Sequence, residues 1–148
     1  MLPLNFKKYN FRFKNSENKV QIFDVVRKKF VQLQPEEWVR QHVIHFLVED
    51  KKYPLSLINV EKQLTINSLK KRYDIVIFNS DGSIELLVEC KAPKIKITQN
   101  TFDQIATYNL QLNANYLMVT NGLQHLYCKM DFIEEKYAFL RQIPDFSR

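Results

Sequence analysis

Residues 73–92 read YDIVIFNSDGSIELLVECKA. This stretch contains two apolar runs separated by Asp81-Gly82, a dipeptide typical of two-residue β-hairpin turns. Each run is rich in Ile, Val, Leu or Phe, as expected of strands buried in a sheet. We therefore predict two antiparallel strands at the centre of the domain.

Three charged residues lie in these otherwise apolar strands. A two-residue turn pairs Ser80 with Ser83 and places Asp74 directly across the ladder from Glu89, on the same face. Lys91 shares that face because it lies two residues beyond Glu89. The opposite face is predicted to be core and consists of Tyr73, Ile75, Ile77, Leu86, Val88 and Cys90.

The residues themselves leave two interpretations of this charge cluster open. Opposed carboxylates repel each other, so a hard divalent cation such as Mg²⁺ would relieve the pair, and Lys91 could stabilise charge in a reaction. Alternatively, Lys91 pairs with both acids in an ordinary salt bridge at a solvated sheet edge. The repulsion also predicts that removing Asp74 or Glu89 leaves the metal-free stability unchanged or slightly raised.

Composition narrows the class of protein. The chain has 148 residues, 45% of them hydrophobic, which fits one domain over 1–148 with a substantial core. It has no apolar run of about 18 residues and no signal-peptide pattern, so we expect a cytoplasmic protein without a membrane span. Cys90 and Cys128 have no metal-type spacing and are predicted to be reduced core residues.

Charge and glycine content bear on the partners. The formal net charge of +6 permits a nucleic-acid partner without requiring one. Gly82 and Gly122 are the only glycines, and they are too few for a Walker A loop or a dinucleotide-binding fingerprint. These residues therefore encode no helicase motor.

The rest of the chain predicts a mixed α/β (α+β) domain. We expect an N-terminal hairpin around residues 15–18, a short strand near 29–33 and a helix over 35–50 that begins with Pro35. A strand over 57–66 then precedes the central hairpin. A second helix over 98–112, strands over 115–122 and 123–130 and a short helix in the tail complete the prediction.

Several motifs together resemble a known family. Asp74 followed by Glu89-Cys90-Lys91 matches the pattern of the PD-(D/E)xK nuclease superfamily. The words PEEWVRQ, VEKQL, KRYDIVIF, LLVECKAP, FDQIATYN and TNG occur in an order that resembles the N-terminal nuclease domain of type I restriction enzyme R subunits, strongest over 31–127. Gln104 and Tyr108 resemble the Q-x-x-x-Y motif of RecB-like nucleases.

The resemblance implies a restriction-endonuclease-like central mixed sheet flanked by helices, and Mg²⁺- or Mn²⁺-dependent cleavage of DNA. It implies metal binding by Asp74, Glu89 and the backbone carbonyl of Cys90. Lys91 would activate water and stabilise the transition state, with Gln104 and Tyr108 beside it. DNA and a helicase, methyltransferase or specificity protein are the implied partners. A catalytically silent nucleic-acid-binding or scaffold module that keeps the nuclease fold is the alternative.

Further candidates carry competing structural interpretations. Glu36 shares a helical stripe with Val39 and Val43 and is a candidate metal ligand, but both Glu36 and Glu37 could simply complement the helix N-terminus. Glu61 could line the site or lie on a solvated edge. Thr101 and Gln104 have capping-box spacing, and Tyr108 could be core. The candidate DNA contacts are Lys70, Lys71, Arg72, Lys94 and Lys96.

Overall fold

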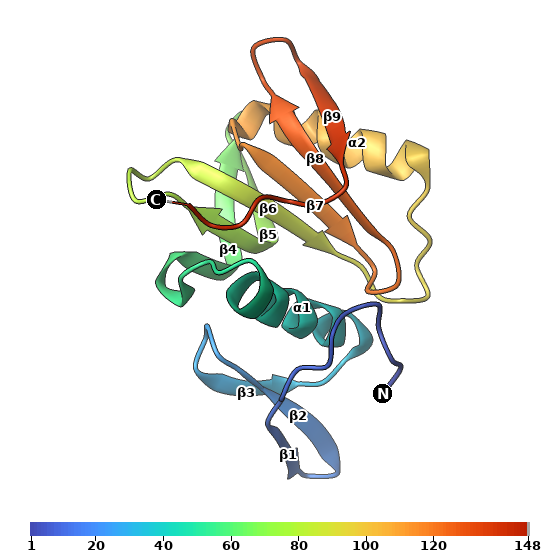
Figure 1. The fold of residues 1–148 in the computed structure, drawn as a ribbon. Helices are drawn as coiled ribbons and strands as arrows, with labels where there is room; N and C mark the ends of the chain where they lie inside the picture. The colour runs from blue at the N-terminus through green and yellow to red at the C-terminus, as the bar shows by residue number, and fades with distance from the viewer. Residues whose placement is uncertain (148) are drawn as a thin grey trace.

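The computed structural model describes residues 1–147, which form two sheets and two principal helices (Figure 1). The small sheet contains β1 (Phe13–Ser16), β2 (Lys19–Asp24) and β3 (Lys29–Gln32). The large sheet contains β4 (Ile58–Ile66), β5 (Leu69–Phe78), β6 (Ile84–Cys90), β7 (Tyr116–Thr120), β8 (His125–Asp131) and β9 (Lys136–Leu140). The helical segments are α1 (Pro35–His45), η1 (Phe46–Asp50), η2 (Leu55–Leu57), α2 (Gln99–Asn109) and η3 (Leu110–Leu112).

The large sheet has the strand order β4-β5-β6-β7-β8-β9. Neighbouring strands are antiparallel except β6 and β7, which are parallel and are connected through α2. A parallel pair needs such a crossover because a tight turn cannot reverse the chain twice. The mixed sheet with helices confirms the predicted α/β class.

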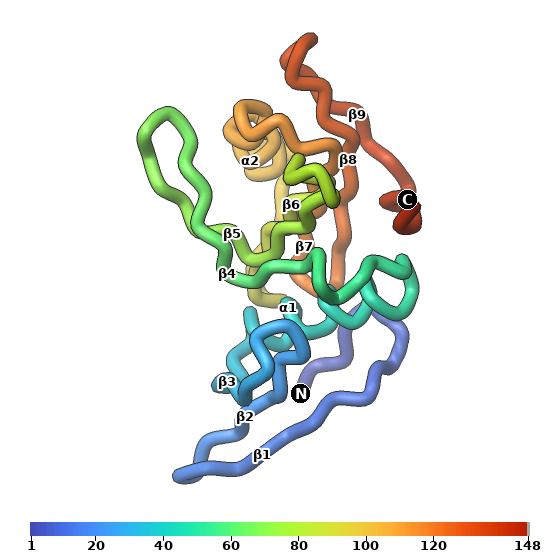
Figure 2. Tube along the Cα trace, turned by 90° about the vertical axis from the view of Figure 1, so that its left-hand side faces the viewer, coloured from blue at the N-terminus to red at the C-terminus, as the bar shows by residue number. Residues whose placement is uncertain are grey.

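The two helices cover opposite faces of the large sheet. Val39, Val43 and Leu47 pack with Ile75 and Val88 in one buried cluster. Phe102 and Ala106 of α2 pack with Val76, Leu87 and Leu117 in a second buried cluster. Figures 1 and 2 show α1 between the large sheet and the small sheet, so α1 is covered on both sides.

The register of the central hairpin follows the prediction, although its turn does not. Ile77 pairs with Leu86 and Ile75 pairs with Val88, as the predicted register requires. The connection between β5 and β6, however, is longer than the predicted two-residue turn. In this loop the N–H of Asn79 donates to the carbonyl of Ser83 at 2.7 Å. An irregularity next to Phe78 restores the register.

One residue of the predicted core face lies on the other side. Ile75, Ile77, Leu86, Val88 and Cys90 belong to the cluster that packs against α1, as expected. Tyr73 instead packs in the cluster on the α2 side. Its hydroxyl donates to Asn109 Oδ1 of α2 at 2.7 Å, and this buried hydrogen bond accounts for its orientation.

The predicted tail helix is wrong. Residues 136–140 form β9, which pairs antiparallel with β8. Tyr137 and Phe139 are two residues apart and therefore share one face of the strand. Both rings contact Phe102 of α2, with centroid distances of 5.6 and 5.0 Å. The packing of both rings on Phe102 favours the extended conformation.

The helix starts agree with the sequence in two places. Pro35 is at the first position of α1. Thr98 is the N-cap of α2, and its hydroxyl accepts from the N–H of Thr101 at 3.1 Å. Thr101 is therefore inside the helix, so the capping-box interpretation of Gln104 is wrong. Among residues 1–147, no helix has both the length and the apolar character to cross a membrane.

Candidate active site

Asp74 lies where β5 and β6 stop pairing. Ile75–Val88 is the last pair in the ladder on this side. Beyond it, Asp74 Oδ2 accepts a hydrogen bond from the backbone N–H of Cys90 at 2.7 Å. The side chain of Asp74 thus takes the place of a backbone acceptor and joins the two strands where they separate.

The backbone on the other side of Asp74 is also irregular. β4 and β5 pair at Val60–Ile75 and at Lys62–Tyr73, but Glu61 and Asp74 between them are not paired. Glu61 has a φ of 54°, a conformation uncommon for a residue with a side chain. At this break in the ladder, Tyr73 and Ile75 point to opposite faces of the sheet, although they are two residues apart.

Arg40 of α1 neutralises Asp74. Its Nη2 lies 2.9 Å from Asp74 Oδ1, and its Nη1 lies 3.0 Å from Glu37. Glu61 is 3.5 Å from the same guanidinium. Arg40 is buried and lies one helical turn beyond Glu36, so α1 directs a positive charge at Asp74.

Glu89 has a different cationic partner. Its carboxylate is 2.7 Å from Lys71 Nζ, and the residue is 8% exposed. The same ammonium lies 4.8 Å from the centre of the Tyr73 ring and 4.9 Å from that of Tyr108 in α2. Cation–π contacts of this length favour a lysine that stays over the rings.

The predicted opposition of the two acids is therefore wrong in detail. Asp74 is bound to α1 through Arg40, whereas Glu89 is directed toward α2 through Lys71. The physical reason is the repulsion of opposed carboxylates, which the strand separation and two separate cations relieve. Removal of Asp74 would leave Arg40 with one partner fewer, an effect that opposes the stability expected from relieving the repulsion.

Lys91 is not the partner of either acid. It follows the end of β6, and its N–H donates to the carbonyl of Thr120 in β7 at 2.8 Å. No carboxylate within residues 1–147 forms an ion pair with its ammonium; Glu89 pairs with Lys71 and is buried. The alternative of a solvated salt bridge in which Lys91 holds both acids is thus wrong.

Glu36 and Glu37 of α1 both lie near Arg40, but they differ in their hydrogen-bond partners. The pKa of Glu36 is raised, first by partial loss of solvation and then by Asp74, while Arg40 and Lys91 act in the opposite direction. Glu37 instead accepts hydrogen bonds from Arg27, Arg40 and Gln41. Glu36 therefore remains the acid of α1 that is free to join the site.

The two residues of the Q-x-x-x-Y motif differ in their surroundings. Tyr108 is half-exposed and lies beside Lys71, which connects it to Glu89. Gln104 is exposed one turn earlier on α2. Tyr108 thus contacts the lysine that pairs with Glu89, whereas the structure records no such contact for Gln104.

The candidate DNA contacts differ in whether their side chains are paired or exposed. Lys71 is engaged with Glu89. The exposed residues are Lys70, Arg72, Lys94 and Lys96. Lys94 and Lys96 lie in the connection between β6 and α2, directly after the Glu89-Cys90-Lys91 motif. These four side chains are open to solvent beside the site.

The sequence interpretation missed a network that supports the site. Asp24 is fully buried in β2 and binds Arg27 at 2.7 Å and Gln41 of α1 at 2.9 Å. Arg27 in turn binds Glu37 at 3.0 Å, and Glu37 binds Arg40. Arg40 could have been found, because it lies four residues after Glu36 on the same helical face. Asp24 and Arg27 gave no such signal.

The donor chemistry at the strand ends fits a hard cation. Asp74, Glu89 and the carbonyl of Cys90 supply oxygen atoms, and Mg²⁺ needs only one or two carboxylates. Both carboxylates are held by protein cations, which a bound metal would have to displace. Within the described chain, no three His, Cys, Asp or Glu side chains are grouped to hold a metal.

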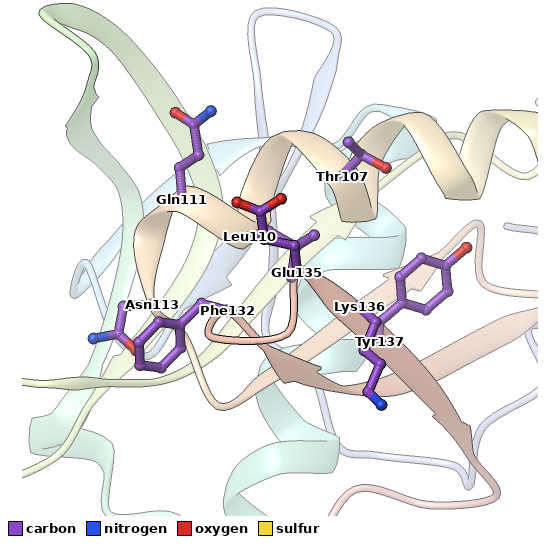
Figure 3. A pocket seen from close by; sticks show the side chains of 8 residues that line it. All are labelled: Thr107, Leu110, Gln111, Asn113, Phe132, Glu135, Lys136 and Tyr137. Carbon is purple, nitrogen blue, oxygen red and sulfur yellow. The ribbon is translucent and has the colours of Figure 1, made fainter.

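One cavity lies beside the candidate site, and a second lies elsewhere. A polar cavity of about 420 Å³ lies at the start of α1 and is lined by Glu36, Glu37, Arg40 and Glu61 together with residues of and after β3. A cavity of about 540 Å³ lies between the end of α2 and the β8–β9 turn, where Figure 3 shows Thr107, Gln111, Phe132 and Tyr137 around it. No candidate site residue lines this second cavity.

The fold and the site define a mixed α/β domain with an acid on one central strand and a Glu-x-Lys motif at the end of the next. Comparison with protein families identifies the group. The chain belongs to the family described as type I restriction enzyme R protein N terminus (HSDR_N), which matches residues 35–144. Among curated proteins, the search finds no match.

Proposed function

We propose that this chain is a Mg²⁺- or Mn²⁺-dependent nuclease domain that hydrolyses DNA phosphodiester bonds. The observation that carries the proposal is the hydrogen bond from Cys90 N–H to Asp74, which brings an acid of β5 to the Glu89-Cys90-Lys91 motif of β6. Membership of a restriction enzyme family also supports a role in DNA cleavage. DNA and other subunits of a restriction system are the corresponding partners.

The metal-binding role falls to oxygen atoms. Asp74, Glu89 and the Cys90 carbonyl are the proposed ligands, and Glu36 is a further candidate because it lines the same cavity as Arg40, the partner of Asp74. The cation would neutralise phosphate charge and lower the pKa of a bound water. Arg40 pairs with Asp74, and Lys71 pairs with Glu89, so the two carboxylates are directed toward different helices in the structure.

The remaining groups act on the phosphate. An ammonium cannot be a metal ligand, but Lys91 can stabilise negative charge that develops on a phosphate in the transition state. Tyr108 and Gln104 project from α2 and would orient Lys71 or the DNA. Lys70, Arg72, Lys94 and Lys96 are the proposed phosphate contacts, because they are exposed beside the motif.

A second candidate function is a nucleic-acid-binding or scaffold module without cleavage. The specific observation that favours it is the pairing of both acids with protein cations. Glu89 is bound to Lys71 at 2.7 Å and Asp74 to Arg40 at 2.9 Å. Partly buried ion pairs of this kind also occur for structural reasons alone.

A cleavage assay separates the two candidates. Supercoiled plasmid and single-stranded DNA are incubated with the protein over a titration of Mg²⁺ and of Mn²⁺, with EDTA as the blank. The nuclease proposal expects metal-dependent product that the Asp74→Asn variant does not form. DNA binding without product at any metal concentration would favour the non-cleaving module.

A further inference from the structure

The net positive charge of the chain is confined to its N-terminal part. Residues 1–33 contain eight Lys or Arg and two Asp or Glu, whereas residues 34–148 contain fourteen of each kind. The full +6 therefore belongs to the first 33 residues. The eight basic residues are Lys7, Lys8, Arg12, Lys14, Lys19, Arg27, Lys28 and Lys29.

This basic part lies outside the region that matches the family, which begins at residue 35. It comprises the irregular N-terminal segment 1–12 and the small sheet of β1, β2 and β3. Figure 1 shows the small sheet on the far side of α1 from the large sheet. The candidate acids belong to β5 and β6 of the large sheet. Arg27 pairs with Glu37 and Glu61 beside the candidate site, so the basic surface consists of the other seven residues.

An aromatic cavity of about 500 Å³ opens in this basic part. Phe11, Phe13 and Trp38 form one wall, with ring centroids 5.2 Å apart for Phe11–Trp38 and 6.3 Å for Phe13–Trp38. Lys7 and Lys8 are also in its lining. The volume is within the range of about 300–1,000 Å³ that small ligands occupy.

The aromatic wall is both exposed and held in place. Phe13 is 52% exposed, although its partner across the ladder, Ile22, is fully buried. Trp38 is fixed because its indole N–H donates to the carbonyl of Leu2 at 2.8 Å. Asn5 N–H donates to the carbonyl of Gly122 at 2.8 Å, which ties the N-terminal segment to the large sheet. The rings are therefore presented to solvent in a fixed arrangement.

We propose that this aromatic-basic surface binds single-stranded DNA, with an unpaired base stacked on Phe13 and the phosphates held by Lys8 and its basic neighbours. Charge complementarity selects a polyanion, because seven of the eight basic residues of this part, all except Arg27, are exposed. Aromatic side chains stack on bases of any sequence, but only when the face of the base is free. The surface therefore favours a single strand over a duplex.

The proposal goes beyond cleavage and needs no metal. Binding is measured in EDTA by fluorescence anisotropy with a labelled oligothymidylate, an abasic oligomer of the same length and a duplex. We expect the wild-type protein to bind the oligothymidylate about tenfold more tightly than the abasic oligomer, because stacking on one ring is lost. Equal affinity for the two oligomers, or tighter binding of the duplex, would overturn the proposal.

Two variants test the residues. Phe13→Ala should weaken oligothymidylate binding about tenfold and abolish the preference over the abasic oligomer, while Phe13→Tyr should retain both. Phe132→Ala is the matched control, because Phe132 is a similarly exposed ring (43%) at the β8–β9 turn. If Phe13→Ala fails to fold, the comparison of oligomers on the wild-type protein and on Phe13→Tyr decides the question.

The phosphate contact has its own test. Lys8 is exposed, and Lys8→Gln should reduce the slope of log affinity against log salt by about 0.7. Lys129→Gln, an exposed lysine on β8, should leave that slope unchanged. An unchanged slope in Lys8→Gln would show that Lys8 does not contact the DNA phosphates. Because every binding measurement is made in EDTA, failure of the single-strand-binding proposal is distinct from failure of metal-dependent cleavage.

Discussion

Asp74 Oδ2 accepts the backbone N–H of Cys90 at 2.7 Å, directly beyond the last paired residues of β5 and β6. An unpaired N–H at the end of a buried strand is costly, so the acid has a structural role as well as a proposed catalytic one. The same carboxylate binds Arg40 at 2.9 Å. A change at Asp74 therefore affects the strand end and α1 together.

We expect Asp74→Ala to lower the free energy of unfolding of the metal-free protein by about 1–3 kcal/mol, because it leaves the Cys90 N–H and one side of Arg40 without a partner. Denaturant melts in EDTA measure the change. Asp145→Ala is the control, because the Asp145 side chain is 69% exposed and its ion pair with Lys51 spans 3.6 Å. Unchanged or increased stability in Asp74→Ala would show that repulsion between the acids dominates.

The Lys71 ammonium would compete with the proposed metal for the Glu89 carboxylate. Replacing Lys71 with methionine keeps the stem over the Tyr73 and Tyr108 rings but removes the charge at 2.7 Å from the carboxylate. We expect Lys71→Met to tighten Mn²⁺ binding about fivefold, in line with a partly exposed ion pair. Calorimetry on the variant and on the exposed-lysine control Lys62→Met measures this. Weaker binding in Lys71→Met would mean that the lysine supports the metal site.

The Asp24 network predicts sensitivity to acid. Burial alone would raise the pKa of Asp24, but hydrogen bonds from Arg27 and Gln41 and the charge of Arg27 lower it overall. A lowered pKa in the folded state means that the stabilisation is complete above the unfolded value of about 3.9 and is lost as the pH falls through the folded value.

Stability of the wild-type protein should therefore decline steeply below about pH 4, and Asp24→Asn should flatten that decline. Asp24→Ala should cost about 3–5 kcal/mol at pH 7, because it leaves Arg27 with a buried charge and one fewer partner. Denaturant melts between pH 3 and pH 7 give both results. Identical pH profiles for Asp24→Asn and wild type would contradict the assignment.

Most of the fold could be predicted because local patterns and burial agree. The hairpin register was correct even though its turn is longer than two residues, since the apolar alternation of Ile75 and Ile77 against Val88 and Leu86 fixes which face is buried. The tail was predicted as a helix but forms β9. Its strand conformation depends on Phe102, which is distant in sequence and invisible to local periodicity.

The candidate site could be predicted in its residue types but not in its pairing. The motif identified Asp74, Glu89 and Lys91, and the helical stripe that favoured Glu36 also contains Arg40. The assumption of a regular ladder then placed the two acids opposite each other. The break at Glu61 and Asp74 redirects Asp74 toward α1, and a local break of this kind has no sequence pattern that we used.

The most direct test of the account is cleavage by a Lys91→Ala variant. Lys91 forms no ion pair with the described acids, so its removal should leave the dissociation constant of the metal and the equilibrium constant of unfolding within about twofold of the wild-type values. The positive charge that Lys91 would place beside the phosphate is lost. With Mg²⁺ or Mn²⁺ and supercoiled plasmid, we predict a loss of cleavage of about 100-fold or more, beside an unaffected Lys129→Ala control. A Lys91→Ala protein that cuts at the wild-type rate, or a wild-type protein that cuts with no metal offered, would contradict the proposed nuclease site.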